Sequence, residues 1–212
     1  MGNYVRKSRT DRIHEIQLAA LQIFLSKGYT QTTTEDIIRS TTLTKGGFYN
    51  YYKSKDEILA DLVRIKNFNY LKKEVNVDGC TTIEDISAAL ARAFLARMTD
   101  ITPQSRLHLL MAQEWANGNP NFTEIYTKVE QETLKLIIDT IHKVFPAFDE
   151  LKSNSHLMLL YRINNTMHYI KKIQYQDNQN EWKVESELLY SLYYHMFSSI
   201  ICEGIGKAYS NP

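Results

Sequence analysis

Apolar residues recur at the spacing of an α-helix through almost the whole chain, and this periodicity limits the possible folds more than any other feature. Ile13, Ile16, Ala20 and Ile23 share one helical face, and the last such face ends near Ile201. No segment shows the alternation of apolar and polar residues that indicates a strand. The chain has only 8 glycines and 4 prolines in 212 residues, too few for the many turns of an all-β fold. The sequence therefore predicts an all-α fold of about nine helices.

The formal net charge of +1 conceals an uneven distribution of charge. Residues 1–55 carry nine Lys or Arg and four Asp or Glu, a net charge of +5, whereas the remaining 157 residues sum to −4. A basic N-terminal segment on a mildly acidic body is typical of a chain that binds nucleic acid through its N-terminus. On charge alone, a chance fluctuation explains the asymmetry equally well.

The residue types needed for catalysis or metal binding do not form a recognisable site. Cys80 and Cys202 are too few for a disulfide framework, and the six histidines lack the spacing of metal ligands. His195 and Cys202 share a helical face, but no third group is evident that would orient them as a nucleophilic pair. No apolar run approaches the roughly 18 residues of a membrane span, and the N-terminus lacks the apolar core of a signal peptide. We expect a cytoplasmic protein that is not an enzyme and uses no metal or cofactor.

Two short predicted helices, 34–41 and 45–52, follow a longer one, which is the pattern of a helix-turn-helix unit. Thr33 or Thr34 can cap the first short helix and Thr44 the second. In such a unit the second helix enters the major groove of DNA, and residues near its N-terminus contact the bases.

The second short helix contains two adjacent glycines, Gly46 and Gly47, each of which costs about 1 kcal/mol relative to alanine in a helix. A purely structural helix gains nothing from them, whereas a helix whose backbone must approach another surface does. At about 100° per residue, Phe48 and Tyr52 share the side suited to the domain core. The adjoining exposed arc carries Lys45, Gly46, Tyr49 and Asn50. A solvated surface helix with exposed tyrosines is the structural alternative.

These side chains match the chemistry of a DNA surface. Lysine suits the O6 and N7 acceptors of guanine, and asparagine can pair with adenine through two hydrogen bonds. Hydroxyl groups and flanking lysines suit phosphates, which position the protein on the duplex. The predicted DNA-binding residues are Thr33, Thr34, Thr44, Lys45, Gly46, Tyr49, Asn50, Tyr51, Lys53 and Lys55.

Residues 28–37 and 43–58 resemble the DNA-binding domain of the tetracycline-repressor (TetR) family. They carry its Gly-aromatic pair, its threonines and its Lys-Gly-x-aromatic-Tyr helix, and the resemblance covers about residues 9–60. The resemblance implies that Lys45 and Gly46 contact bases. It also implies that phosphates are contacted by Thr34, Thr44, Tyr49, Tyr51 and Lys55. The chain departs from the family at Tyr51-Tyr52, where His-Phe is common, and at Asn50, where an aromatic residue is frequent.

The resemblance also implies the organisation of the whole chain. We expect a three-helix helix-turn-helix DNA-binding domain at 8–66, followed by a larger helical ligand-binding and dimerisation domain at 67–212. The implied protein is a homodimeric repressor that binds a palindromic operator in double-stranded DNA and is released by a small-molecule effector. The departure at Asn50 means that no operator sequence can be transferred from the family.

The C-terminal part carries no motif of its own. Its last two predicted helices, 155–174 and 184–207, are broadly apolar, and we predict that they form the dimer interface; a buried monomer core is the alternative. The pocket candidates are polar or aromatic residues on otherwise apolar helices, each of which could equally be ordinary packing or surface. They are His108, Gln113, Trp115, Arg162, Asn165 and His168.

Two further classes of function remain open at this point. One is a helical enzyme or small-molecule binding protein with a vestigial basic head, which turnover without DNA affinity would favour. The other lies within the family: an activator, or a regulator that binds a protein ligand. The intact glycine-bearing helix and the lack of a catalytic constellation favour a DNA-binding regulator over the enzyme, whereas the sequence does not separate a repressor from the alternatives within the family.

Overall fold

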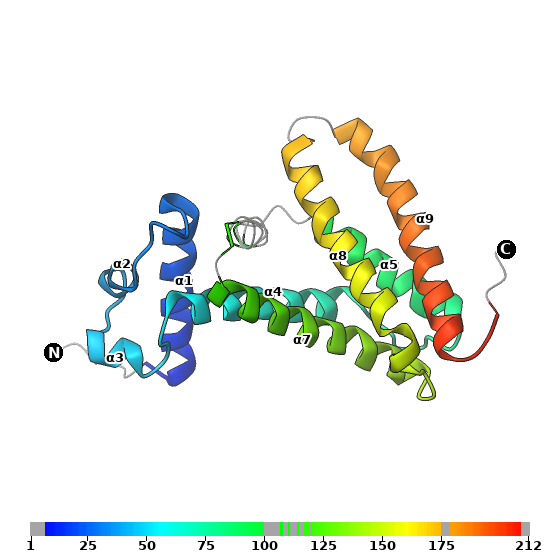
Figure 1. Ribbon diagram of the computed structural model, residues 1–212, viewed down its shortest axis with the longest axis horizontal. Coiled ribbons are helices and arrows are strands. Elements are labelled where there is room, and N and C mark those ends of the chain that lie inside the picture. The colour runs from blue at the N-terminus through cyan, green and yellow to red at the C-terminus, as the bar shows by residue number, and fades with distance from the viewer. Residues whose placement is uncertain are drawn as a thin grey trace. The chain divides into compact units, whose positions relative to one another are not determined.

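The computed structural model describes residues 7–99, 107, 110, 114, 117, 118, 120–174 and 179–208. Within these residues the protein is entirely helical, with eight helices and no strand (Figure 1). The helices are α1 (Arg9–Lys27), α2 (Thr34–Arg39), α3 (Lys45–Tyr49), α4 (Lys55–Glu74), α5 (Ile83–Thr99), α7 (Pro120–Val144), α8 (Glu150–Gln174) and α9 (Gln179–Gly204). The predicted all-α fold is confirmed. A further helix predicted from Thr102 through Trp115 lies largely outside the described residues.

The two short helices, α2 and α3, end earlier than predicted. The Ser40 and Thr41 amides donate to carbonyls three residues back, at 3.1 and 3.0 Å, and the Tyr51 amide donates to the Phe48 carbonyl at 2.9 Å. Such bonds tighten the last turn of each helix and bring it to an end. In contrast, α8 begins at Glu150, before the predicted residue 155, because its first residues are largely exposed and tolerate polar side chains.

Local capping explains where the first three helices begin. Ser8 caps α1 in a reciprocal box with Asp11, and Thr33 caps α2 in the same way with Asp36. The Thr44 hydroxyl caps α3 by accepting a hydrogen bond from the Gly47 amide at 3.1 Å. Each cap satisfies amides that the helix itself leaves without partners, which is why the sequence alone could place the starts of α2 and α3.

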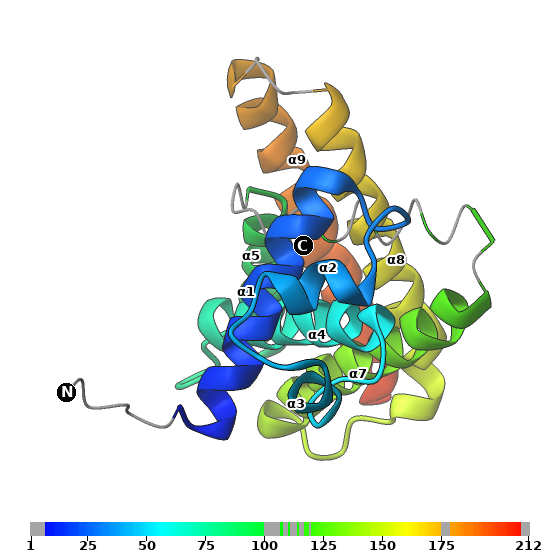
Figure 2. The same ribbon diagram turned by 90° about the vertical axis from the view of Figure 1, so that its left-hand side faces the viewer.

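The chain divides into two compact units, the first of which comprises Met1–Ile65 with Thr102–Val129. Residues 102–129, which the sequence analysis assigned to the C-terminal domain, therefore group with the helix-turn-helix. Figure 2 views this unit from the side of α2 and α3. Its fully buried side chains include Ile16, Ala20, Phe24, Ile37, Phe48, Ile58 and Val63.

The second unit comprises Lys66–Ile101 with Glu130–Pro212. Here α5, α8 and α9 pack on one another (Figure 1). The Phe94 ring lies edge-on to Tyr193 at 5.6 Å and to Phe197 at 4.9 Å between ring centroids. The Asn164 amide donates to the Phe94 carbonyl at 3.1 Å and to the Tyr193 hydroxyl at 3.0 Å, tying the three helices together. The fully buried residues include Ile86, Leu90, Ala91, Ile141, Leu160, Tyr193, Phe197 and Ile201.

Helix α9 has small side chains on its buried side and leucines on its surface. Ser198 and Cys202 are buried inside the unit, whereas Leu188 and Leu192 are exposed. Small side chains allow close helix packing, which accounts for their inward position. Burial raises the pKa of the Cys202 thiol, helped by the nearby Glu84 carboxylate, and this opposes formation of a thiolate.

Candidate nucleic-acid interface

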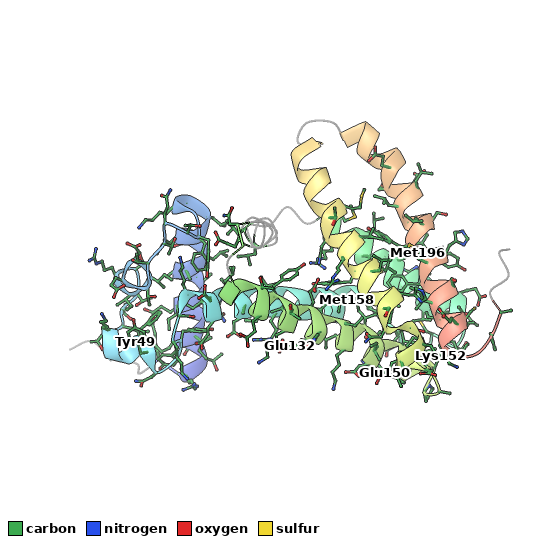
Figure 3. The ribbon with its side chains drawn as sticks, viewed as in Figure 1. Tyr49, Glu132, Glu150, Lys152, Met158 and Met196 are labelled. Carbon is green, nitrogen blue, oxygen red and sulfur yellow. The ribbon has the colours of Figure 1, made fainter. Side chains whose placement is uncertain are left out.

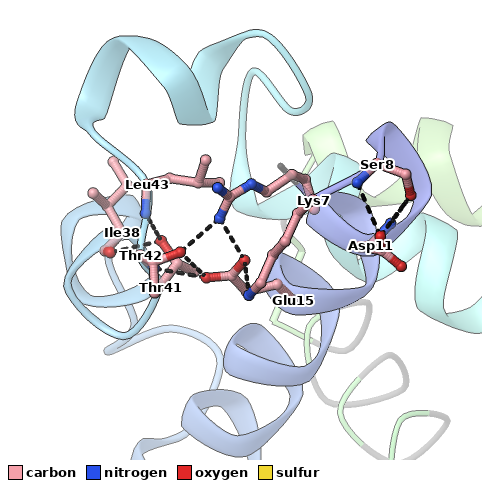
Figure 4. A network of polar contacts seen from close by, with 9 residues as sticks. Lys7, Ser8, Asp11, Glu15, Ile38, Thr41, Thr42 and Leu43 are labelled. Carbon is pink, nitrogen blue, oxygen red and sulfur yellow. Dashed lines mark hydrogen bonds and ion pairs between the residues drawn. The ribbon is translucent and has the colours of Figure 1, made fainter. Parts of the chain in front are cut away.

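A polar network fastens α1 to the turn between α2 and α3, and its centre is the Glu15 carboxylate (Figure 4). The Thr42 amide and hydroxyl each donate to Glu15 at 2.7 Å, and Lys7 and Arg12 each donate to it at 2.9 Å. Burial opposes ionisation of Glu15, but these four donors outweigh it and lower its pKa to about 2. The turn of the helix-turn-helix is therefore held by a carboxylate that is ionised at neutral pH.

Helix α2 is anchored at its N-terminus by the predicted DNA contact Thr33. The Thr33 hydroxyl donates to Asp36 at 2.8 Å and accepts from the Asp36 amide at 3.1 Å. Lys27 donates to the same carboxylate at 2.6 Å, and with the Thr33 bonds it lowers the pKa of Asp36. Thr33 thus has a capping role, and its neighbour Thr34 is the half-buried first residue of the helix.

Helix α3 presents the exposed face that the sequence indicated. Phe48 and Tyr52 are buried, as their helical position predicted. Tyr49, labelled on α3 in Figure 3, is 42% exposed. The other exposed residues of this face are Thr44, Lys45, Gly46 and Asn50.

The two glycines of α3 differ in their surroundings. A Cβ atom built on Gly46 meets nothing within 4 Å, so no packing within the described part of the protein requires glycine there. A Cβ atom on Gly47 lies 3.1 Å from the Thr44 hydroxyl oxygen, which caps the same helix. The cap explains Gly47, whereas no contact within the described part of the protein explains Gly46.

Lys45, the predicted base reader, contacts the neighbouring helix. Its ammonium donates to the Glu35 carboxylate at 3.0 Å, and both side chains are largely exposed. The hydrogen bond and the charge of Glu35 raise the pKa of Lys45, and Lys45 in turn lowers the pKa of Glu35. The ammonium is therefore charged and held at the surface that α2 and α3 share.

The two tyrosines after α3 have different roles. Tyr51 is half-buried, and the Arg9 guanidinium lies 5.3 Å from the centre of its ring. The Tyr52 hydroxyl is buried, accepts from Gln17 at 2.8 Å and donates to Asp61 at 2.8 Å. Burial and the Asp61 carboxylate raise the pKa of Tyr52. The helical spacing predicted that the Tyr52 ring faces the core, but it did not predict this link from α1 to α4. The only signal for the link was a tyrosine at a position where phenylalanine is common in the TetR family.

Lys55 does not extend outward as a phosphate contact would, which departs from the expectation. Its ammonium donates to the carbonyls of Tyr29 at 2.8 Å, Thr32 at 2.9 Å and Thr30 at 3.4 Å. It also lies 4.3 Å from the centre of the Tyr29 ring, and burial lowers the pKa of Lys55. An ammonium has three donors, and all three are directed at the loop between α1 and α2. Lys53, in contrast, is exposed.

Replacing Lys55 by methionine is expected to lower the free energy of unfolding by about 1–3 kcal/mol, because three loop carbonyls, two of them in part-buried bonds, lose a charged donor. Urea denaturation measures the loss. The matched variant Lys53→Met changes an exposed side chain and should shift stability by less than about 0.5 kcal/mol. If Lys55→Met were as stable as the wild type and instead reduced the salt dependence of DNA binding, Lys55 would be a phosphate contact after all.

Two of the six predicted ligand-binding residues have described side chains. Arg162, on α8, forms a two-pronged ion pair with the buried Glu130 at 3.2 and 2.8 Å. Asn165, one turn beyond Tyr161, is buried, and both polar atoms of its side chain have no hydrogen-bond partner among the residues that the structure describes. The side chains of His108, Gln113, Trp115 and His168 lie outside the described residues.

No three His, Cys, Asp or Glu side chains in the described part of the chain form a group that could hold a metal ion. No helix there has the length and apolar character needed to cross a bilayer.

Three capped N-terminal helices, of which the third exposes a lysine, a bare glycine, a tyrosine and an asparagine, define a helix-turn-helix DNA-binding domain. Residues 16–62 match the model of the family described as "Bacterial regulatory proteins, tetR family". Residues 16–62 therefore form a DNA-binding domain of this family's type, and the all-helical fold resembles that of a TetR-family regulator.

Comparisons with individual proteins agree. The chain is 25% identical over 130 residues to YuxN of Bacillus subtilis (strain 168), an HTH-type transcriptional regulator, and the match covers 59% of this chain and 43% of the relative. The fold resembles that of Salmonella enterica GusR, with a TM-score of 0.66 at 14% identity over 92% of this chain and 97% of the other. A TetR-family regulator from Syntrophomonas wolfei gives a TM-score of 0.67 at 16% identity, covering 92% and 96%. At these identities the structural likeness shows a shared fold.

Proposed function

We propose that the protein is a cytoplasmic, homodimeric repressor of transcription that binds a palindromic operator and is released by a small molecule bound in its C-terminal domain. The open space around Gly46 on the exposed face of α3 carries this proposal. A helix that keeps a glycine with no internal reason for it, beside a charged lysine, fits a backbone that approaches a DNA groove. The predicted contacts are the exposed residues of that face, together with Tyr51, Lys53 and Thr34.

The dimer part of the proposal is supported by exposed leucines on α8 and α9. Leu159 is 56% exposed, and Leu188 and Leu192 are 66% and 48% exposed. Large exposed apolar side chains on two helices of one unit fit a surface that binds another protein. A second copy is the occupant that the proposal needs, because a two-fold dimer presents two α3 helices to half-sites about one DNA turn apart.

The effector part of the proposal is supported by the side chains of Asn164 and Asn165. Both are buried on α8, and within the described part of the chain the Asn165 amide and the carbonyl oxygen of Asn164 have no hydrogen-bond partner. Leaving such groups unpaired costs about 1–3 kcal/mol each, so a ligand with complementary donors and acceptors would recover that energy. Release from DNA then requires the ligand to bind one conformation of the dimer more tightly than the other.

The test is a titration of the purified full-length protein with duplex DNA from its own promoter region at several salt concentrations. We expect tight binding of two protomers per duplex, with an affinity that falls steeply as salt rises. Absence of binding at low salt, or binding without salt dependence, would exclude the proposal. Turnover of a small molecule without DNA affinity would favour the enzyme alternative.

Lys45→Ala sharpens this test. If Lys45 reads a base, its loss weakens binding to the selected duplex by about 1–3 kcal/mol and relaxes the preference at one position. Binding measured against a set of single-base variants of the duplex shows whether that position becomes tolerant. A uniform loss of affinity for all sequences would make Lys45 a phosphate contact.

A further inference from the structure

The ion pair between Lys45 and Glu35 does little for the stability of the protein. The two atoms lie 3.0 Å apart, but the Lys45 and Glu35 side chains are 66% and 50% exposed. Exposed pairs of this kind contribute little to stability, because water screens the two charges and both long side chains lose conformational freedom. The pair is therefore better explained by what the two groups do on the exposed surface than by the folding of the unit.

The position of Glu35 matters because it lies on the predicted DNA face. Its carboxylate comes from the first turn of α2 and contacts the first residue of α3. DNA presents about one negative charge per 1.7 Å of its axis, so an acid beside the reading helix opposes binding to any sequence. A residue that lowers general affinity has a use only if it raises discrimination between sequences.

The ion pair with Glu35 changes the contacts that Lys45 can make with DNA. While Glu35 holds the ammonium, Lys45 neutralises no phosphate and releases no counterion, so a complex with random DNA gains nothing from it. Guanine offers two acceptors, O6 and N7, at its major-groove edge, and these can replace the single carboxylate contact. Random sequence offers them at the right place only occasionally.

We propose that Glu35 is a positioning residue that sets sequence specificity by holding Lys45 in an ion pair until a correctly placed guanine replaces the carboxylate. This inference rests on the proposed DNA-binding function. It assigns to an acidic residue on α2 the role of suppressing non-specific binding by its neighbour on α3.

The test compares Glu35→Gln with the wild type on two duplexes, one selected by the wild-type protein from a random pool and one of scrambled sequence. We expect the variant to bind the scrambled duplex about three- to tenfold more tightly near 0.1 M salt, with a salt dependence steeper by about one unit. Binding to the selected duplex should change less, so the ratio of the two affinities falls. Asp139→Asn, which removes an exposed acid from α7, is the matched control and should leave the ratio unchanged.

A double variant shows whether Glu35 acts through Lys45. In the Lys45→Ala background, Glu35→Gln should no longer steepen the salt dependence on the scrambled duplex. If the steepening persists, or if Glu35→Gln shifts both duplexes equally, the proposal is wrong and Glu35 acts only as a general negative charge. If the wild type fails to select or bind any duplex, the proposed DNA-binding function is wrong, and the proposed role of Glu35 is wrong as well.

Discussion

Replacing Gly46 by alanine is expected to stabilise the free protein and at the same time to weaken DNA binding by at least about tenfold. Alanine is favoured over glycine by about 1 kcal/mol within a helix, and the new methyl group meets nothing within 4 Å. The loss of binding follows if the α3 backbone approaches the base edges there, because the methyl group would then hold the helix away from the groove. A variant that becomes more stable and loses function separates the two roles of one residue.

Thermal or urea unfolding of the free protein and DNA titration of the same preparation measure the two effects. Gly47→Ala is the control on the same helix. Its methyl group would press on the Thr44 hydroxyl at 3.1 Å, so it should gain less stability than Gly46→Ala or lose some. If Gly46→Ala bound the selected duplex as tightly as the wild type, the backbone of α3 would not approach DNA at this residue.

The α3 face was predictable from the sequence because helical geometry and capping are local. Thr44 begins the helix, and Phe48 and Tyr52 face the core, as their spacing requires. The sequence could not distinguish Gly46 from Gly47, since both sit in the same short helix. The difference lies in one side chain, the capping hydroxyl of Thr44, which reaches Gly47 and leaves Gly46 open.

Side chains that act across the fold were beyond sequence reasoning. Lys55 contacts carbonyls more than 20 residues earlier in the chain, and the Tyr52 hydroxyl joins Gln17 to Asp61. Neither partner set follows from periodicity, because each depends on how α4 packs on α1 and its loop. The same limit applies to α9, where composition alone did not show that Ser198 faces inward and Leu188 outward.

Gly204, at the end of α9, lies where the second unit leaves no room for a larger side chain. A Cβ atom built on Gly204 overlaps two ring carbons of Phe148 and lies 2.9 Å from the Ser153 hydroxyl oxygen. Phe148 and Ser153 are both buried, and the Asp149 amide also donates to the Gly204 carbonyl at 2.8 Å. The ring cannot move without disturbing this packed corner. Gly204→Ala should therefore lower the free energy of unfolding by about 1–3 kcal/mol, although alanine is the better helix former.

Urea denaturation of Gly204→Ala beside Gly46→Ala provides a matched pair, since both place a methyl group on a helical glycine. The two variants should change stability in opposite directions, because one methyl group meets a buried ring and the other meets open space. A second substitution, Phe148→Leu, removes the ring and should restore part of the stability lost in Gly204→Ala. If Gly204→Ala were as stable as the wild type, the corner would accommodate the methyl group, and close approach would not explain glycine at this position.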